Sequence, residues 1–167
     1  MLHEVTARML RIGFFMRAEV IWRKARGAGG NCAWGSWRSP ANPVIRDVHE
    51  YCLCFSKGTF DRVVKGESDI SAEDFMESAL SVWEIAPESA GRVHHPAPFP
   101  GELPKRFIQL YTYKDEWVLD PFMGSGSTAV AAVRTSRKWV GYDIDADYCD
   151  LARKRSAAAE ASLPLGP

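Results

Sequence analysis

The segment from Trp117 to Thr128 limits the possible folds of this chain more than any other segment. An apolar run typical of a buried strand leads into a turn containing Gly124 and Gly126, and a helix is expected to follow from Ser127. Glycine permits positive φ angles and close contact between the backbone and a ligand. A strand, a glycine turn and a helix in this order are typical of α/β domains that bind a nucleotide-like cofactor.

A second predicted strand, Lys138 to Ile144, ends in carboxylates. Asp143 follows Gly126 by 17 residues, close to the spacing of about 20 at which an acid meets a ribose hydroxyl. A carboxylate accepts two hydrogen bonds from adjacent hydroxyls. Taken alone, Asp143 could also be a helix cap or a solvated acid. A phosphate loop is the poorer alternative, because a third glycine and a lysine after Gly126 are both missing.

A proline-rich segment precedes these two strands. Four prolines occur between His95 and Pro104, and they predict a stiff, extended stretch of backbone. Helical spacing follows at Leu103, Phe107, Leu110 and Tyr111.

Together, these strings resemble the C-terminal half of the DNA amino-methyltransferases, which methylate N4 of cytosine or N6 of adenine with S-adenosylmethionine. The motif order resembles the permuted (beta) class, in which the cofactor half follows the catalytic half. The resemblance is dense over residues 93–155 and looser over residues 11–57. The looser part rests on the runs Arg17–Lys24, Ala33–Trp37 and Arg46–Tyr51.

The resemblance implies a cofactor site. Asp120 and the turn from Phe122 to Thr128 would hold the methionine part of S-adenosylmethionine, and Asp143 would bind the ribose. Ile144 would pack on the adenine, with Phe99 and Pro100 closing the pocket from the other side. The predicted cofactor residues are Phe99, Pro100, Asp120, Phe122, Gly124, Ser125, Gly126, Ser127, Thr128, Asp143 and Ile144.

One motif of the family is missing from this sequence. The family carries a catalytic Ser/Asp/Asn-Pro-Pro-Tyr/Phe loop, whereas no two of the 10 prolines here are adjacent. In the family this loop would precede residue 1, so we expect a methyltransferase domain without its first part and predict no catalytic residue in this chain. A second chain would then supply the loop. The gap left by the missing strands would be filled by a second chain, by exchange within a homodimer or by direct pairing of the flanking strands.

The expected fold class is α/β, a partial Rossmann-like S-adenosylmethionine-dependent methyltransferase fold. In the family strand order 3-2-1-4-5-7-6, its mixed sheet would lack strands 3 and 4. We expect a single truncated domain in four segments: a strand 5 and hairpin part with a basic loop (1–66), an acidic connection (67–92), the cofactor unit (93–158) and a tail (159–167).

Local patterns predict the smaller elements. Met1 to Ile12 is an amphipathic helix that Gly13 would end, and strands are expected at Phe14–Lys24 and Glu50–Lys57. Ser71 would cap a short helix with Phe75, Met76 and Leu80 facing inward, and Asp145 would cap the last helix.

The net charge of zero hides an uneven distribution. Residues 1–66 hold 11 Lys and Arg against 5 Asp and Glu, and residues 67–104 hold 1 against 8. A basic first segment suits contact with phosphates of duplex DNA. The predicted nucleic-acid-binding residues are Arg23, Lys24, Arg26, Trp34, Trp37 and Arg38. The two tryptophans could equally pack as a local core under the loop.

Composition disfavours several other classes of protein. The four cysteines have no metal or redox spacing, so reduced thiols are expected, and His94 and His95 have no ligand set beside them. We expect no metal. The sequence contains no long apolar run and no signal peptide, which favours a cytoplasmic protein without a membrane span.

Two functional hypotheses stay open. The chain is either a fragment or split subunit of a site-specific DNA methyltransferase that binds S-adenosylmethionine, or a non-catalytic remnant that binds cofactor, DNA or protein. Within the first hypothesis, cytosine-N4 is favoured over adenine-N6, because the segments Ala33–Trp37 and His49–Tyr51 resemble the cytosine-N4 branch of the family more closely.

Overall fold

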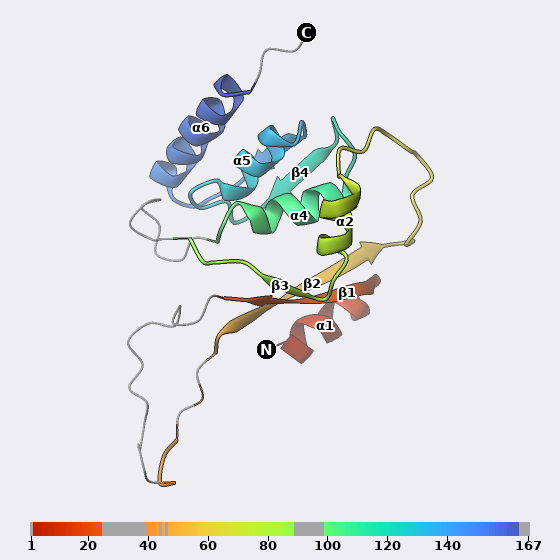
Figure 1. Ribbon diagram of the computed structural model, residues 1–167, viewed down its shortest axis with the longest axis vertical. Coiled ribbons are helices and arrows are strands. Elements are labelled where there is room, and N and C mark those ends of the chain that lie inside the picture. Colours follow the sequence, from red (N-terminus) through yellow and green to blue (C-terminus); the bar gives the residue numbers. More distant parts are fainter. Residues whose placement is uncertain (1, 25–39, 44, 46, 89–98, 164–167) are drawn as a thin grey trace. The chain divides into compact units, whose positions relative to one another are not determined.

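The computed structural model describes residues 2–24, 40–43, 45, 47–88 and 99–163. The chain divides into two compact units, shown in Figure 1. The first unit comprises Met1–Arg62 and Leu80–Pro87, and the second comprises Val63–Ala79 and Glu88–Pro167. The predicted acidic connection is therefore shared between the two units.

The first unit is built on a three-stranded mixed sheet in the order β2-β1-β3. Helix α1 (Leu2–Arg11) ends before Gly13, which has a φ of 90°, as predicted. Strand β1 (Phe14–Arg23) pairs antiparallel with β2 (His49–Lys57) from Phe14 opposite Lys57 to Arg23 opposite His49, with an irregularity between Met16 and Ala18. The two predicted strands are thus confirmed to within a residue or two.

Strand β3 (Val82–Glu84), which was not predicted from the sequence, runs parallel to β1. Its Trp83 is fully buried, and Val20, Trp22 and Ile85 are buried in the same unit. The Trp22 Nε1–H donates to the Ile85 carbonyl at 2.8 Å. A three-residue strand is too short to show an alternating pattern, so only the buried tryptophan marks it.

In the described residues, the second unit combines a two-stranded parallel sheet with four helices. Strands β4 (Trp117–Asp120) and β5 (Lys138–Gly141) pair in register from Trp117 opposite Lys138. The helices are α2 (Ala72–Ser78), α4 (Glu102–Tyr111), α5 (Ser127–Arg134) and α6 (Ala146–Ala161). Figure 1 shows α5 between α4 and α6, and it packs against both. Strands β4 and β5 and helices α4 and α5 lie within the segment 93–158 expected for the cofactor unit. Helix α2 precedes this segment, and α6 continues into the expected tail.

The core of the second unit lies on one face of the β4-β5 sheet. Ile108 of α4 and Ala131 and Ala132 of α5 are buried, and Val118 and Trp139 pack against them. The alternate strand residues point away from these helices, and Trp117 and Leu119 are 65% and 62% exposed. In the part of the chain that the structure describes, β4 pairs with β5 alone.

The predicted cap of α2 is correct, but the predicted inward face of this helix is wrong. The Ser71 side chain accepts a hydrogen bond from the Asp74 amide at 3.0 Å. Phe75, Met76 and Leu80 are exposed, and the buried residue of α2 is Ser78. A helix of two turns can bury only one narrow face. Glu77 of α2 also forms an ion pair with Arg106 of α4 at 3.3 Å. Polar contacts therefore help to hold α2.

Arg137, just before β5, connects three parts of the second unit. Its side chain is fully buried and bonds Asp69 at 2.6 Å. It also donates to the carbonyl and the hydroxyl oxygen of Thr112, at 2.7 and 3.0 Å, where α4 ends. A buried guanidinium needs such partners, because an unpaired charge in the interior is costly.

We predict that Arg137→Met destabilises the protein by about 3 kcal/mol, because Asp69 loses its buried partner. The measurement is the free energy of unfolding from urea denaturation. Arg153→Met is the matched control, since Arg153 forms an exposed pair with Asp150 and should cost less than about 1 kcal/mol. Equal losses in the two variants would contradict the role given to Arg137.

Candidate functional site

The turn between β4 and α5 depends on two glycines. Gly124 and Gly126 have φ angles of 50° and 80°, a region that other residues rarely adopt. A Cβ atom on Gly126 would lie 2.6 Å from the Cβ of Ala152 on α6. Gly126 is therefore required both by its backbone conformation and by the close approach of α6.

Asp143, which follows β5, is held against this turn. Its carboxylate accepts hydrogen bonds from the Gly124 amide at 2.8 Å and from the Asp145 amide at 3.0 Å. Each carboxylate oxygen has two lone pairs, so these two bonds alone do not exhaust its accepting capacity. The structure thus brings together the predicted turn and the predicted ribose-binding acid, which lie 19 residues apart in sequence.

Backbone hydrogen bonds fix the two turns to each other. The Met123 amide donates to the Tyr142 carbonyl at 2.9 Å, and the Tyr142 amide donates to the Asp120 carbonyl at 3.0 Å. The Asp120 carboxylate accepts from the Phe122 amide at 3.0 Å, so it shapes the start of the glycine turn. This arrangement favours a preformed site, since little backbone ordering would be needed on binding.

Each of the two turns carries a large apolar side chain that is exposed. Phe122 is 87% exposed, and Ile144, next to Asp143, is fully exposed. Exposed apolar surface beside a fixed hydrogen-bond acceptor suits a ligand with a flat apolar ring and neighbouring hydroxyls, which is the chemistry of a nucleoside. The residues at this turn therefore fit the nucleoside part of a cofactor such as S-adenosylmethionine.

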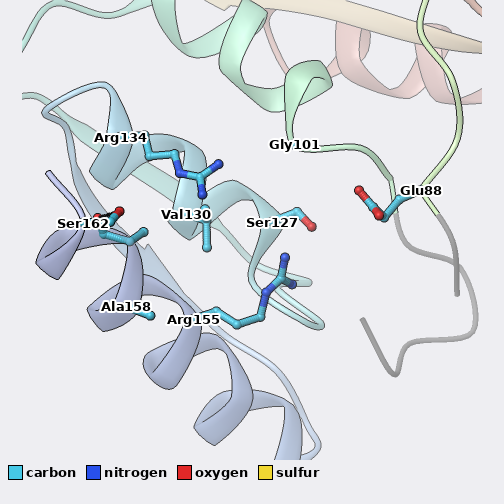
Figure 2. Close-up of a pocket in the computed structure, with 9 residues that line it drawn as sticks. Glu88, Gly101, Ser127, Val130, Arg134, Arg155, Ala158 and Ser162 are labelled. Atoms are coloured by element: carbon cyan, nitrogen blue, oxygen red, sulfur yellow. Dashed lines mark hydrogen bonds between the residues drawn. The ribbon is translucent and has the colours of Figure 1, made fainter. Parts of the chain in front are cut away.

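The predicted residues Phe99 and Pro100 lie just before α4. Pro100 is buried, and its carbonyl accepts from the Leu103 amide at 3.0 Å. The next residue, Gly101, lines a pocket of about 410 Å³ together with Ser127 of the glycine turn. Figure 2 shows this pocket. The pocket is lined by Ser127 but by neither Phe122 nor Asp143. It therefore adjoins the predicted cofactor residues at one end of the glycine turn.

Arg155 of α6 is a site residue that was not predicted from the sequence. Its Nη1 donates to the Ser125 carbonyl at 2.6 Å, which fixes the middle of the glycine turn. Burial lowers the pKa of the Arg155 guanidinium, and nearby Glu88 opposes this shift. Its place on α6, three residues after the buried Ala152, could have indicated an inward-facing position.

Of the residues predicted to bind nucleic acid, the structure describes two, and both lie in the first unit. Arg23, at the end of β1, bonds Glu84 at 2.7 Å. Lys24 pairs with Glu50 and lies 5.4 Å from the centre of the Trp22 ring. Phosphate contact would have to compete with these carboxylates. Four other predicted residues, Arg26, Trp34, Trp37 and Arg38, lie outside the described residues.

Other candidate chemistry is limited in the described part of the chain. Cys52, Cys54 and Cys149 are not joined in disulfides. Burial raises the pKa of Cys52 to about 11, which keeps it a thiol at neutral pH. Among the described residues, no group of three or more His, Cys, Asp or Glu could hold a metal ion. His94 and His95 lie outside them. No described helix is long and apolar enough to cross a membrane.

Comparison with protein families and curated proteins finds DNA methyltransferases. A family model described as DNA methylase matches residues 3–154. The type II methyltransferase M.MthZI of Methanothermobacter thermautotrophicus is 31% identical over 156 residues, which is 86% of this chain and 44% of that protein. This chain spans about half the length of the curated relatives that it matches, or somewhat less.

Solved structures agree with this match. The structure of TTHA0409 from Thermus thermophilus in complex with S-adenosyl-L-methionine has a TM-score of 0.76 and 28% identity, covering 97% of this chain and 61% of that one. The cytosine-N4-specific PvuII DNA methyltransferase has a TM-score of 0.72 and 26% identity, covering 92% of this chain and 55% of that one. The α/β, Rossmann-like methyltransferase fold class is confirmed.

We predict that Gly126→Ala destabilises the protein by about 2 kcal/mol, because alanine is strained at positive φ and meets Ala152. Urea denaturation measures the loss. Gly101→Ala is the matched control, since Gly101 has a helical φ of −58° and open space at its Cβ position. A Gly126 variant as stable as the Gly101 variant would show that the turn tolerates a side chain.

Proposed function

Since the chain belongs to the DNA methylase family, we propose that it forms the S-adenosylmethionine-binding part of a site-specific DNA amino-methyltransferase. The observation that supports this most is the Asp143 carboxylate, held on the Gly124 amide beside exposed Phe122 and Ile144. This arrangement suits a ribose and a base. It is also the position at which ligands bind α/β sheets, outside the carboxyl ends of parallel strands.

Each part of the site has a role in this proposal. Asp143 accepts hydrogen bonds from the ribose hydroxyls, and Ile144 packs on the adenine. The turn from Phe122 to Thr128, shaped by Asp120, holds the methionine part, and Phe99 and Pro100 close the pocket. Bound S-adenosylmethionine supplies the electrophilic methyl group. The residues of this chain orient that group, and orientation contributes much of the rate in a direct transfer.

The proposed substrate is duplex DNA with the target base flipped out of the stack. We favour cytosine-N4 over adenine-N6. Support comes from the segments Ala33–Trp37 and His49–Tyr51 and from the resemblance to PvuII methyltransferase, which is named as cytosine-N4-specific. Arg23, Lys24, Arg26 and Arg38 would contact phosphates, and Trp34 and Trp37 would stack on bases.

We also propose a polypeptide partner for the second unit. Trp117 and Leu119 form an exposed apolar face on β4, and Val140 of β5 lies on the same side of the sheet. Exposed apolar surface of this kind marks an interaction site. A second chain would cover this face and supply the Pro-Pro loop that the sequence lacks. A second copy of this chain could cover the face but would not supply the loop. The loop would then hold the exocyclic amine near the methyl group.

We predict that the chain binds S-adenosylmethionine and that Asp143→Asn weakens this binding about tenfold, because the hydroxyl contacts lose a charged acceptor. Isothermal titration calorimetry measures the dissociation constants. Ile144→Ser should also weaken binding, and its fully exposed position makes an effect on folding small. Asp150→Asn is the control, since Asp150 pairs with Arg153 on the surface. If the wild-type chain bound no cofactor, the non-catalytic remnant would be the better account.

We further predict that the isolated chain transfers no methyl group to duplex DNA, because nothing in its sequence positions the target amine. The assay follows tritium from labelled S-adenosylmethionine into DNA. Adding a polypeptide that carries the Pro-Pro-Tyr/Phe loop should restore transfer. Methylation by the chain alone, lost in Asp143→Asn, would show that the absent loop is dispensable.

A further inference from the structure

The pocket in Figure 2 is lined by charged side chains that the proposed cofactor site does not use. It lies within the second unit, between α5, α6 and the start of α4, and its volume is about 410 Å³. Ser127, Val130 and Arg134 line it from one face of α5. Arg155, Ala158, Ala159 and Ser162 line it from one face of α6, and Gly101 and Glu88 complete it. Two of these residues are arginines and one is an acid.

The two guanidinium groups extend from different helices toward the same space (Figure 2). Arg155 uses one of its five N–H donors on the Ser125 carbonyl. Burial lowers the pKa of the Arg155 guanidinium. The Glu88 carboxylate opposes this shift, and the positive charge of Arg134 adds to it. Among the described residues, Arg134 forms no ion pair within 4.0 Å. Two neighbouring cations with a single acid leave this pocket with an excess of positive charge.

We propose that this pocket binds the phosphate group of a small molecule. Guanidinium groups arriving from two directions match the geometry of a tetrahedral anion. The pocket runs along α5 from buried Ser127 at its N-terminus, where negative charge is favoured, to Arg134 at its C-terminus, so the attraction for an anion rests on the two guanidinium groups. The phosphate group would lie between the side chains of Arg134 and Arg155, in the pocket that Ser127 and Gly101 also line.

The size and shape of the pocket indicate a small ligand. Its volume falls within the range of about 300–1,000 Å³ that is typical of small-molecule sites, so it holds more than a bare phosphate ion. Val130, Ala158 and Ala159 supply an apolar strip for the remainder of the molecule. A DNA backbone is convex, so it would contact the edge of this pocket without filling it. The ligand class is therefore a phosphate ester of a small organic group.

Glu88 gives the proposal a distinctive test, because its carboxylate repels the anion that the arginines attract. Titration with inorganic phosphate at constant ionic strength, followed by calorimetry, should show binding that weakens about five- to tenfold in Arg134→Gln. In Glu88→Gln the affinity should increase by a similar factor. Arg153→Gln is the matched control: it removes the same charge from the exposed face of α6 and should leave phosphate affinity unchanged.

The affinity for phosphate should fall in Arg134→Gln and rise in Glu88→Gln. These opposite changes distinguish an effect on the pocket from loss of the fold, because a variant that merely unfolds cannot bind more tightly. Arg134→Gln breaks no ion pair within the described part of the chain, and thermal denaturation should give wild-type stability for this variant. The titration contains no cofactor, so its result is independent of the proposed methyltransferase function. Absence of phosphate binding, or equal affinity in the Arg134, Glu88 and Arg153 variants, would overturn the proposal. So would variants that change affinity for a short DNA duplex but not for phosphate.

Discussion

The close approach of the glycine turn to helix α6 is the constraint on which the second unit depends. Gly126 has no Cβ atom, so Ala152 of α6 can pack against the start of α5. With α6 in that position, the acid that precedes it, Asp143, reaches the Gly124 amide at 2.8 Å. Arg155, one turn further along α6, bonds the Ser125 carbonyl. A single missing side chain thus permits the contacts that join the glycine turn, the acid and two helices into one site.

Local chemistry explains which elements the sequence predicts well. Gly13 ends α1, Ser71 caps α2 and Asp145 caps α6, where its side chain accepts from the Asp147 amide at 2.9 Å. Each of these signals involves residues within one turn of each other, so it is visible in the sequence alone. Asp143 lies 19 residues from Gly124, and its place beside the glycine turn was expected from the strand–turn–helix spacing and the family resemblance; the structure places the two in hydrogen-bond contact.

Contacts between distant residues explain what the sequence did not predict. Arg137 and Asp69 are 68 residues apart, and nothing near either one indicates that they form a buried pair. Strand β3 exists because Val82 to Glu84 pair with the end of β1, a partner that three residues cannot specify. The apolar face of α2 was predicted from spacing, yet Phe75 and Met76 are exposed because α4 contacts other positions. The Arg134–Arg155 pocket required the packing of α5 on α6.

The central claim is that the glycine turn and Asp143 form an S-adenosylmethionine site. Amide chemical-shift changes in the ¹⁵N-labelled protein, recorded during titration with S-adenosylmethionine, test it most directly. The account predicts saturable changes concentrated at residues 99–101, 122–128 and 142–145, with β1 and β2 unaffected. Changes confined to the first unit, or none at saturating cofactor, would contradict the claim.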